Sequence, residues 1–368
     1  MEAALKVVYR GILFPVIRIL VNIFQRVSFR SQNIEMPMVD LFQATTREEL
    51  LYLCQLALQD HPPLLKRNFV EVSQNLSGSQ ERKIRFMTWN TLADALCNGT
   101  ENFIKCPKEC LNWHVRKFRC VEEILMYNPD IICLQEVDHF ADFFQPLLHQ
   151  VGYVGCFNPK PDSPCLDCVN NAGPDGCAMF YKVSKFNLVD QKLPILEVER
   201  RGTMLQTNQV AILSKLKYQV SEGKEQSFLV ATTHLKAKTG WESLRLNQGC
   251  NLIDIAKEMS KGCPLIIGGD FNAVPSEPVY KAFVESKFES AYKLVSGDNS
   301  EPLFTTWKIR PRGEACHTID YIWLTKDNVQ PVAYLQFPTG EEIGKNRLPS
   351  WEYPSDHLSL VCDFVFSH

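Results

Sequence analysis

The sequence predicts an α/β fold, a four-layer α/β sandwich in which two packed sheets are flanked by helices. Strand-like apolar runs alternate with helical patterns from Lys83 to the end of the chain, and this alternation is typical of layered α/β domains. Short polar motifs stand at the ends of several of these runs. The chain has 368 residues, of which 45% are hydrophobic and 22% charged, so it is long enough to bury a large core.

The first 30 residues form a basic leader. Its cations are Lys6, Arg10, Arg18, Arg26 and Arg30, and Glu2 is its only acidic residue. Because this composition is typical of an imported amphipathic helix, the sequence predicts a mitochondrial transit peptide, with a membrane-surface helix as the alternative. Arg18 interrupts the apolar stretch and disfavours a helix that spans the membrane. The expected location is mitochondrial, or cytoplasmic where the leader is absent or not used.

Residues 31–80 are expected to form a helical segment followed by a linker. Thr46–Gln59 has a capping threonine, early acidic residues and amphipathic spacing, which together predict one helix. The stretch Glu71–Arg82 is polar and rich in Ser, Gln and Asn, which is typical of a linker. We therefore place the catalytic domain at residues 81–368.

Helices and strands are expected in turn through that domain. Trp113–Tyr127 carries apolar residues at helical spacing and predicts a helix, and Trp241–Met259 predicts another. Strands are expected over five apolar runs, Lys83–Met87, Ile131–Leu134, Ser227–His234, Pro264–Gly268 and Ser359–Phe366.

Charge and cysteine content narrow the class of protein. The net charge of −3 provides no overall basic field, so a general nucleic-acid-coating role is disfavoured and no DNA partner is expected. Without a secretory signal, the 14 cysteines are expected to stay reduced. The tightest cluster is Cys156, Cys165, Cys168 and Cys177, for which core or surface thiols are favoured over a structural zinc site.

Five polar motifs define the candidate site. They are Trp89-Asn90, Gln135-Glu136-Val137, Gly269-Asp270-Phe271-Asn272, Thr318-Ile319-Asp320-Tyr321 and Ser355-Asp356-His357. A strand that ends in Asn, Glu, Asp or His places that group at one rim of its sheet. Each motif alone is equally well explained by a turn or a cap. Together, at the ends of this many strands, they predict one pocket for a hard metal ion and a phosphoryl group.

Three residues of these motifs have chemistry that suits phosphoryl transfer. Glu136 follows a buried strand directly and is the candidate Mg²⁺ ligand. Asp270 can accept a proton from a water molecule, and Asn272 can donate to a phosphoryl oxygen. Gly269 would let the backbone approach a ligand. An Asx turn is the structural alternative for this motif.

The remaining motifs supply imidazole and carboxylate groups. Asp356 and His357 stand side by side before the last strand, where they can bind metal, orient water or hold a transition-state oxygen. Asp320 can orient a catalytic histidine or simply begin a strand.

The motifs resemble those of the endonuclease/exonuclease/phosphatase family, whose strand ends carry WN, QE, GDFN, DY and SDH. The resemblance covers residues 81–368 and implies the four-layer sandwich of a phosphoesterase with Mg²⁺ as its cofactor. Five further stretches, expected in loops, narrow it to one branch of that family. They are Phe157–Cys165, Asn171–Gly176, His234–Trp241, Thr306–Arg310 and Asn346–Pro349.

The resemblance also implies roles for the site residues. Glu136 would hold Mg²⁺, supported by Asn90 and Asp356, and Asp270 would align or deprotonate the attacking water. Contacts to the phosphoryl oxygens would come from Asn272, His234 and His357. Asp320 would orient the imidazole of either His234 or His357.

For that branch, the implied activity is removal of the 2′-phosphate from NADP⁺ and NADPH by a monomeric Mg²⁺-dependent phosphatase. The alternative is a 3′–5′ poly(A)-specific exoribonuclease acting on mRNA, and a non-catalytic scaffold is least favoured because every metal-site residue is present. Five cations would bind either substrate, namely Lys160, Lys236, Lys238, Lys308 and Arg310. The branch's pattern has Arg where this chain has Lys238, so the charge is kept and the planar fork is lost.

Overall fold

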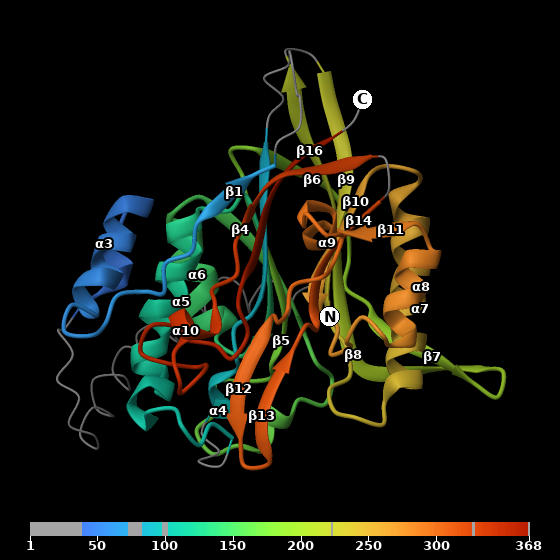
Figure 1. Ribbon diagram of the computed structural model, residues 1–368. Coiled ribbons are helices and arrows are strands. Elements are labelled where there is room, and N and C mark those ends of the chain that lie inside the picture. The colour runs from blue at the N-terminus through green and yellow to red at the C-terminus, as the bar shows by residue number, and fades with distance from the viewer. Residues whose placement is uncertain (1–38, 73–82, 98–101, 222–223, 326–327, 367–368) are drawn as a thin grey trace, which may run out of the picture.

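Two facing β-sheets with helices on their outer sides make up the computed structural model (Figure 1). It describes residues 39–72, 83–97, 102–221, 224–325 and 328–366. The predicted four-layer α/β sandwich is confirmed. The basic leader lies outside the described residues, and so does the expected domain boundary near residue 80. No helix in the described part of the chain is both long and apolar enough to cross a membrane.

The first sheet has seven strands in the order β1-β15-β16-β2-β3-β5-β4. Its members are β1 (Phe69–Glu71), β15 (Val329–Leu335), β16 (Leu360–Phe366), β2 (Ile84–Asn90), β3 (Ile131–Val137), β5 (Gly176–Lys182) and β4 (Tyr153–Pro159). Only β2 and β3 run parallel, and all other neighbours are antiparallel. The carboxyl ends of β2 and β3 therefore share one edge.

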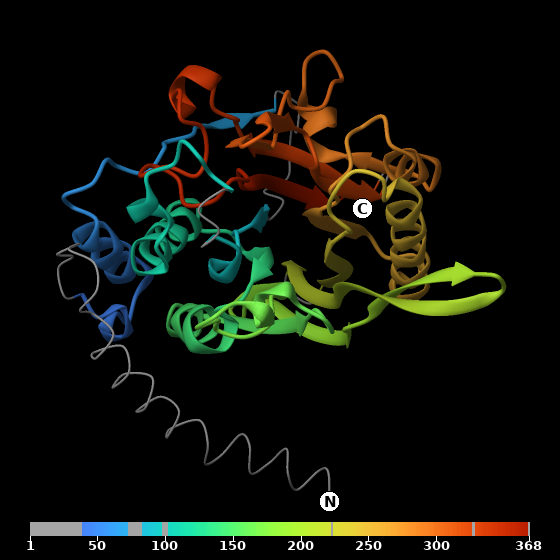
Figure 2. The ribbon, with the colours of Figure 1, turned by 90° about the horizontal axis from the view of Figure 1, so that it is seen from below.

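The second sheet has the strand order β11-β14-β10-β9-β8-β6, and β7 pairs with one part of β8. Its members are β11 (Phe288–Ser290), β14 (Asp320–Thr325), β10 (Leu265–Asp270), β9 (Lys224–His234), β8 (Thr203–Ser221), β6 (Phe186–Lys192) and β7 (Ile195–Arg200). Here β9 and β10 form the parallel pair. Figure 2 shows the β7–β8 hairpin extending away from the body of the sandwich.

A separate two-stranded hairpin extends below the sheets in Figure 1. It consists of β12 (Thr306–Arg310) and β13 (Gly313–His317), which pair antiparallel. The prediction that Thr306–Arg310 is a loop was therefore wrong. Its side chains are only partly buried beyond the first residue, so its apolar pattern was too weak to predict a strand.

Helices cover the outer face of each sheet (Figure 1). The α-helices are α3 (Arg47–Ala57), α4 (Asp94–Cys97), α5 (Trp113–Tyr127), α6 (Gln145–Gln150), α7 (Glu242–Ser260), α8 (Pro278–Glu285), α9 (Ala291–Val295) and α10 (Gly340–Ile343). Three 3₁₀ turns occur at Leu41–Gln43, Lys108–Leu111 and Pro164–Asp167, and a π turn at Phe140–Phe144. The helix predicted over Thr46–Gln59 is confirmed as α3, and Thr46 with Glu49 forms a capping box at its start.

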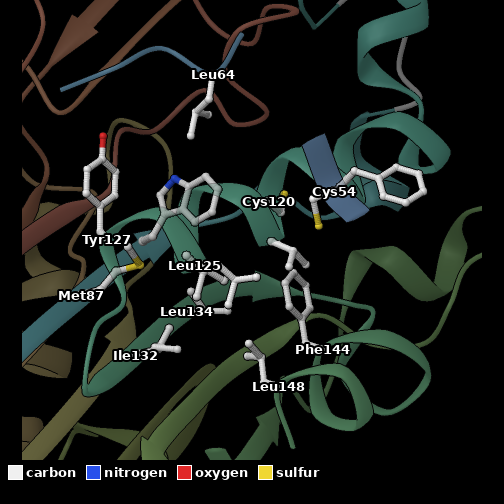
Figure 3. Packing of buried hydrophobic residues seen from close by; sticks show 14 of the residues in the cluster. Cys54, Leu64, Met87, Cys120, Leu125, Tyr127, Ile132, Leu134, Phe144 and Leu148 are labelled. Atoms are coloured by element: carbon white, nitrogen blue, oxygen red, sulfur yellow. The ribbon is translucent and has the colours of Figure 1, made fainter. Parts of the chain in front are cut away.

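Three hydrophobic clusters hold the layers together. One lies between the sheets, where Phe86 of β2 meets Val230 of β9. Another joins the first sheet to its helices, with Cys54 of α3 and Leu134 of β3 in the same cluster (Figure 3). A third joins the second sheet to α7 and α8. Fully burying one such aliphatic or aromatic side chain stabilises the fold by about 1.5–3 kcal/mol.

Residues 39–72 pack directly on the sandwich. Strand β1 pairs with β15 at the edge of the first sheet, so Glu71 belongs to a strand and not to the expected linker. Arg67 forms a buried ion pair with Glu123 of α5 at 2.7 Å. Because a buried charge without its partner is costly, this pair fixes the segment before β1 against α5.

Two glycines let β10 approach its neighbours closely. A Cβ atom on Gly268 would lie 2.8 Å from the side chains of Phe86 and Thr88 in β2, and one on Gly269 would lie 2.3 Å from the Thr233 carbonyl oxygen in β9. We expected Gly269 to admit a ligand. The structure shows instead that these glycines bring the end of β10 against β2 and β9, which determines where Asp270 lies.

Candidate active site

Strands of both sheets bring their polar ends to one place. Asn90 is the last residue of β2, and in the second sheet His234 and Asp270 are the last residues of the parallel strands β9 and β10. Asp270 stands opposite His234 on one side and opposite Asp320, the first residue of β14, on the other. The predicted convergence of strand ends is therefore observed.

A single amide joins the two sheets at this point. Nδ2 of Asn90 donates to Oε1 of Glu136 at 3.0 Å and to Oδ2 of Asp270 at 2.9 Å. Glu136 has φ of 53°, and the pairing of β3 with β5 is irregular between Leu134 and Val137. Positive φ is unfavourable for a residue with a Cβ atom and is concentrated at functional sites. This bulge turns the Glu136 carboxylate toward Asn90 and Asp270.

His357 is oriented by Asp320. Its Nδ1 lies 2.9 and 3.1 Å from the two oxygens of Asp320, and its Nε2 lies 3.8 Å from Oδ2 of Asp270. Of the two histidines that Asp320 was expected to orient, the structure thus selects His357. Burial alone would lower the pKa of His357, but the carboxylates of Asp320 and Asp270 outweigh it and raise the pKa to about 9. The ring is therefore cationic at neutral pH.

His234 occupies the opposite side of Asp270 in a different charge state. Its Nε2 lies 3.5 Å from Oδ2 of Asp270 and 3.9 Å from Oε1 of Glu136. Its Nδ1 lies 3.5 Å from the ammonium of Lys160. Burial and the positive charges of Lys160 and His357 hold the pKa of His234 well below its ordinary value. The two imidazoles of the site therefore differ in charge.

Asp270 stands at the centre of these contacts. Its Oδ1 accepts from the backbone N–H of Asn272 at 2.9 Å, which forms an Asx turn, while Oδ2 faces Asn90 and both imidazoles. Burial raises the pKa of Asp270 to about 7, aided by the charge of Asp320 and opposed by His357 and Asn90. A carboxyl group with its pKa near neutrality suits a general base.

Asp356 binds two of the expected substrate-binding cations. Lys308 contacts its Oδ2 directly, and Arg310 lies 3.6 Å from the same oxygen. Burial alone would raise the pKa of Asp356, but the charges of Lys308, His357 and Arg310 outweigh it and lower the pKa far below its ordinary value. The hairpin β12–β13 thus carries both cations to the rim of the site.

The other expected residues lie in the loops that follow β9 and β10. The Asn272 amide donates to the Leu235 carbonyl at 3.1 Å, so it contacts backbone and not the centre of the site. The ammonium of Lys236 lies 5.5 Å from the centre of the Trp241 ring. Lys238 has φ of 79°, and its carbonyl accepts from Arg245 at 2.8 Å. Neither contact places Lys236 or Lys238 on the carboxylates.

The donor atoms at the centre suit a hard divalent cation. Two groups of side chains among the described residues are close enough to hold a metal ion, Glu136 with His234 and Asp270, and Asp270 with Asp320 and His357. Carboxylate oxygens dominate both, and neither includes a cysteine. Mg²⁺ prefers one or two carboxylates with several waters, so the carboxylates of these groups fit Mg²⁺, with Glu136 as the more accessible ligand.

The supporting roles of three residues were missed in the sequence, although Trp89 stands in one of the five motifs. Thr305 donates its hydroxyl to Asp320 at 2.5 Å, and Trp89 donates its indole N–H to the His357 carbonyl at 2.7 Å. Asp175 pairs with Lys160 at 2.6 Å. A buried acid in the Gly173–Gly176 turn was the one available signal, because an acidic residue rarely lies fully buried without a partner.

Comparison with known proteins identifies the class to which this fold and site belong. Residues 87–357 match the model of the Endonuclease/Exonuclease/phosphatase family. The chain belongs to this family, and the predicted resemblance is confirmed. Together with the carboxylate groups that fit a metal, this membership makes the chain a metal-dependent hydrolase of phosphate esters.

The relatives point to one branch of that family, nocturnin. The chain is 52% identical to nocturnin of Xenopus laevis over 325 residues, which cover 87% of this chain and 82% of that protein. The solved structure of the human nocturnin catalytic domain with a bound sulfate anion is 45% identical, with a TM-score of 0.68 over 83% of this chain and 99% of that one. The CCR4-Not complex 3′-5′-exoribonuclease subunit Ccr4 of Candida glabrata is 30% identical over 80% of this chain and 38% of that protein. The branch that the loop stretches indicated is thus confirmed.

Proposed function

We propose that this chain is a Mg²⁺-dependent phosphatase that removes the 2′-phosphate of NADP⁺ and NADPH, giving NAD⁺ and NADH. One observation carries the proposal. Lys308 and Arg310 gather on the buried Asp356 beside His357, while the chain as a whole has a net charge of −3. Such a compact basic rim suits a small polyanion better than a long one, which would need cations along an extended surface.

The geometry of the site supports hydrolysis of a phosphate monoester. Oδ2 of Asp270 would take a proton from the attacking water, since its pKa of about 7 leaves it partly ionised at neutral pH. The Nε2 atoms of His234 and His357 lie on either side of that oxygen, at 3.5 and 3.8 Å. Both would donate to phosphoryl oxygens as charge develops there.

Glu136 would hold Mg²⁺, which when bound neutralises charge on the phosphoryl oxygens. Asn90 keeps the Glu136 and Asp270 carboxylates at a fixed separation by donating to both. Without that amide, two adjacent carboxylates would repel each other. Asn90 therefore positions the two carboxylates, of which Glu136 would bind the metal and Asp270 would activate the water.

The basic rim supplies the contacts that would select a dinucleotide. Arg310 presents a planar fork that can bind one phosphate through two hydrogen bonds, and Lys308 adds a compact charge beside it. Both are partly exposed, at 31% and 14% of their side-chain surface. They can exchange some of their contact with Asp356 for a phosphate of the substrate.

A 3′–5′ poly(A) exoribonuclease is the second candidate. The 30% identity with an exoribonuclease subunit of the CCR4-Not complex favours it, and the same acids and imidazoles would serve a phosphodiester. This chain spans only 38% of that protein, so the comparison leaves out most of the exoribonuclease subunit.

The deciding experiment offers both substrates to the same enzyme. Phosphate release from NADPH is measured beside shortening of an oligo(A) RNA, at equal enzyme and Mg²⁺ concentrations. An Asp270→Asn variant prepared in parallel reports any contaminating hydrolase, because it loses the proposed base. We expect rapid phosphate release and little shortening. Shortening that far outpaces phosphate release would replace the first function by the second.

A further inference from the structure

Lys160 is not a free substrate-binding cation, although the sequence predicted one. Its side chain is 9% exposed, and its ammonium lies 2.6 Å from Oδ2 of Asp175 and 3.5 Å from Nδ1 of His234. Asp175 is fully buried. The side chain is thus enclosed between a carboxylate and a ring that itself faces the site.

A third residue completes the chain of contacts. The Ser163 hydroxyl donates to Oδ1 of Asp175 and accepts from the backbone N–H groups of Asp175 and Cys165, at 2.9 and 3.2 Å. The backbone N–H of Lys160 donates to the Asp175 carbonyl at 2.9 Å. Both side-chain oxygens of Asp175 therefore have partners, and the carboxylate has little freedom to move.

The chemistry of an ammonium determines the tautomer of His234. Lysine has three N–H donors and no acceptor, so at the shared contact Lys160 must donate and Nδ1 of His234 must carry the lone pair. The ring proton then lies on Nε2. That nitrogen faces Asp270 and Glu136 at 3.5 and 3.9 Å, where the phosphoryl group would bind.

We propose that Ser163, Asp175 and Lys160 are positioning residues that hold His234 as an Nε2–H donor toward the reacting phosphoryl group. This rests on the proposed phosphoester hydrolysis but applies to NADPH and to RNA alike. The site then holds two imidazole donors whose rings are oriented by groups of opposite charge. Asp320 accepts from Nδ1 of His357, whereas Lys160 donates to Nδ1 of His234.

Kinetics distinguish a substrate-binding role of Lys160 from a positioning role. A residue that binds the substrate would, when removed, raise KM chiefly for NADPH. A positioning residue would lower kcat for every substrate, with KM little changed. For Lys160→Met we expect kcat to fall by roughly two- to tenfold, in proportion to the population that loses the Nε2–H donor. The fall should be equal for NADPH and for adenosine 2′-monophosphate.

The tautomer itself can be observed without substrate. Long-range ¹H–¹⁵N spectra of histidine-labelled protein distinguish a protonated Nε2 from a protonated Nδ1, and His234→Gln identifies the signal among the eight histidines of the chain. In the parent enzyme we expect the Nε2–H form. In Lys160→Met we expect a mixture of tautomers, and in Ser163→Ala a smaller change in the same direction.

A matched control addresses stability. Lys182 also pairs with a buried aspartate, Asp130 at 3.0 Å, but at the far end of β5 from Gly176. Lys182→Met also removes a cation from a buried aspartate, although Asp130 keeps its ion pair with Lys185 at 2.8 Å, and it should leave the His234 signal and kcat unchanged. Ser163→Ala keeps the test possible if Lys160→Met does not fold, because it retains both charges of the buried pair.

Three results would overturn the inference. The first is an Nδ1–H form of His234 in the parent enzyme, and the second is a His234 signal that does not change from the parent in either Lys160→Met or Ser163→Ala. The third is a rise in KM for NADPH alone in Lys160→Met, with kcat preserved. If the parent enzyme fails to hydrolyse NADPH, the proposed function fails, yet the spectra still decide the role of Lys160 because they need no substrate.

Discussion

Replacing Asp320 by asparagine tests how His357 obtains its charge. The substitution keeps the size of the side chain and removes the negative charge 2.9 Å from Nδ1 of the ring. If His357 acts as a cationic donor, the variant should be less active than the parent enzyme at neutral pH. As the pH rises, its activity should also decline at a lower pH than that of the parent.

The magnitude follows from the charges around the ring. Burial lowers the pKa of His357, and Asp320 and then Asp270 raise it from 6.5 to about 9. At about 1.4 kcal/mol for each pKa unit, the net stabilisation of the cation is roughly 3 kcal/mol. Without Asp320, burial and the charge of Lys308 still lower the pKa, while Asp270 and Asp356 still raise it. We therefore expect the pKa of His357 to fall from about 9 toward its ordinary value.

The assay is the pH dependence of kcat/KM for NADPH between about pH 6 and pH 10, which reports groups of the free enzyme. A donor with a raised pKa is protonated below that pKa and is lost as the pH rises through it. As the pH rises, the parent enzyme should therefore lose activity near pH 9, and Asp320→Asn should lose it at a lower pH. At neutral pH the variant should be slower by roughly two- to tenfold, because only part of its His357 is then protonated.

Asp363→Asn is the matched control. Asp363 is also buried, in β16, and pairs with Arg85 at 2.6 Å away from the strand ends that form the site. Its substitution should leave the basic limb of the profile in place. A basic limb that stays near pH 9 in Asp320→Asn would refute the assignment of that limb to the His357–Asp320 pair.

Three further predictions concern the metal, the basic rim and the leader. Glu136→Ala should keep the far-UV circular dichroism of the parent and lose at least about 10²-fold in kcat; activity within tenfold of the parent would remove Glu136 from the site. Arg310→Ala should raise KM for NADPH by roughly ten- to a hundredfold with kcat less affected. Lys238→Arg should hold or improve turnover. Steady-state kinetics in which Arg310→Ala keeps the KM of the parent would show that the rim binds no phosphate. We propose that residues 1–30 direct a fused fluorescent protein to mitochondria, and a diffuse reporter in cells would contradict this.

Strand ends were predictable because burial leaves a strong pattern. The parallel strands β2, β3, β9 and β10 each contain a run of buried apolar residues, and each was expected within a few residues of its observed bounds. Strand β6 was not expected, since most of its residues are exposed. An exposed strand need not alternate apolar and polar residues, so its sequence resembles a loop.

The sequence could not predict which charged side chains pair with one another at the site. Asp320 could serve either histidine, and only the packing of the two sheets places it 2.9 Å from His357. Lys160 carries the same charge as Lys308, yet one is enclosed by Asp175 and the other reaches the rim on β12. These contacts join residues distant in the sequence, and no local pattern encodes them.

The charges at the site nearly balance before any ligand binds. Five acids and four cations are linked by a chain of contacts through the site, namely Glu136, Asp175, Asp270, Asp320 and Asp356 with Lys160, Lys308, Arg310 and the protonated His357. Burial and the ammonium of Lys160 beside its ring disfavour a second cationic imidazole at His234, so the neutral ring is the more favourable donor there. The charge of Mg²⁺ would then be offset mainly by that of a phosphate dianion. The site is therefore suited to binding metal and phosphate together, since either one alone would leave an uncompensated charge in a largely buried place.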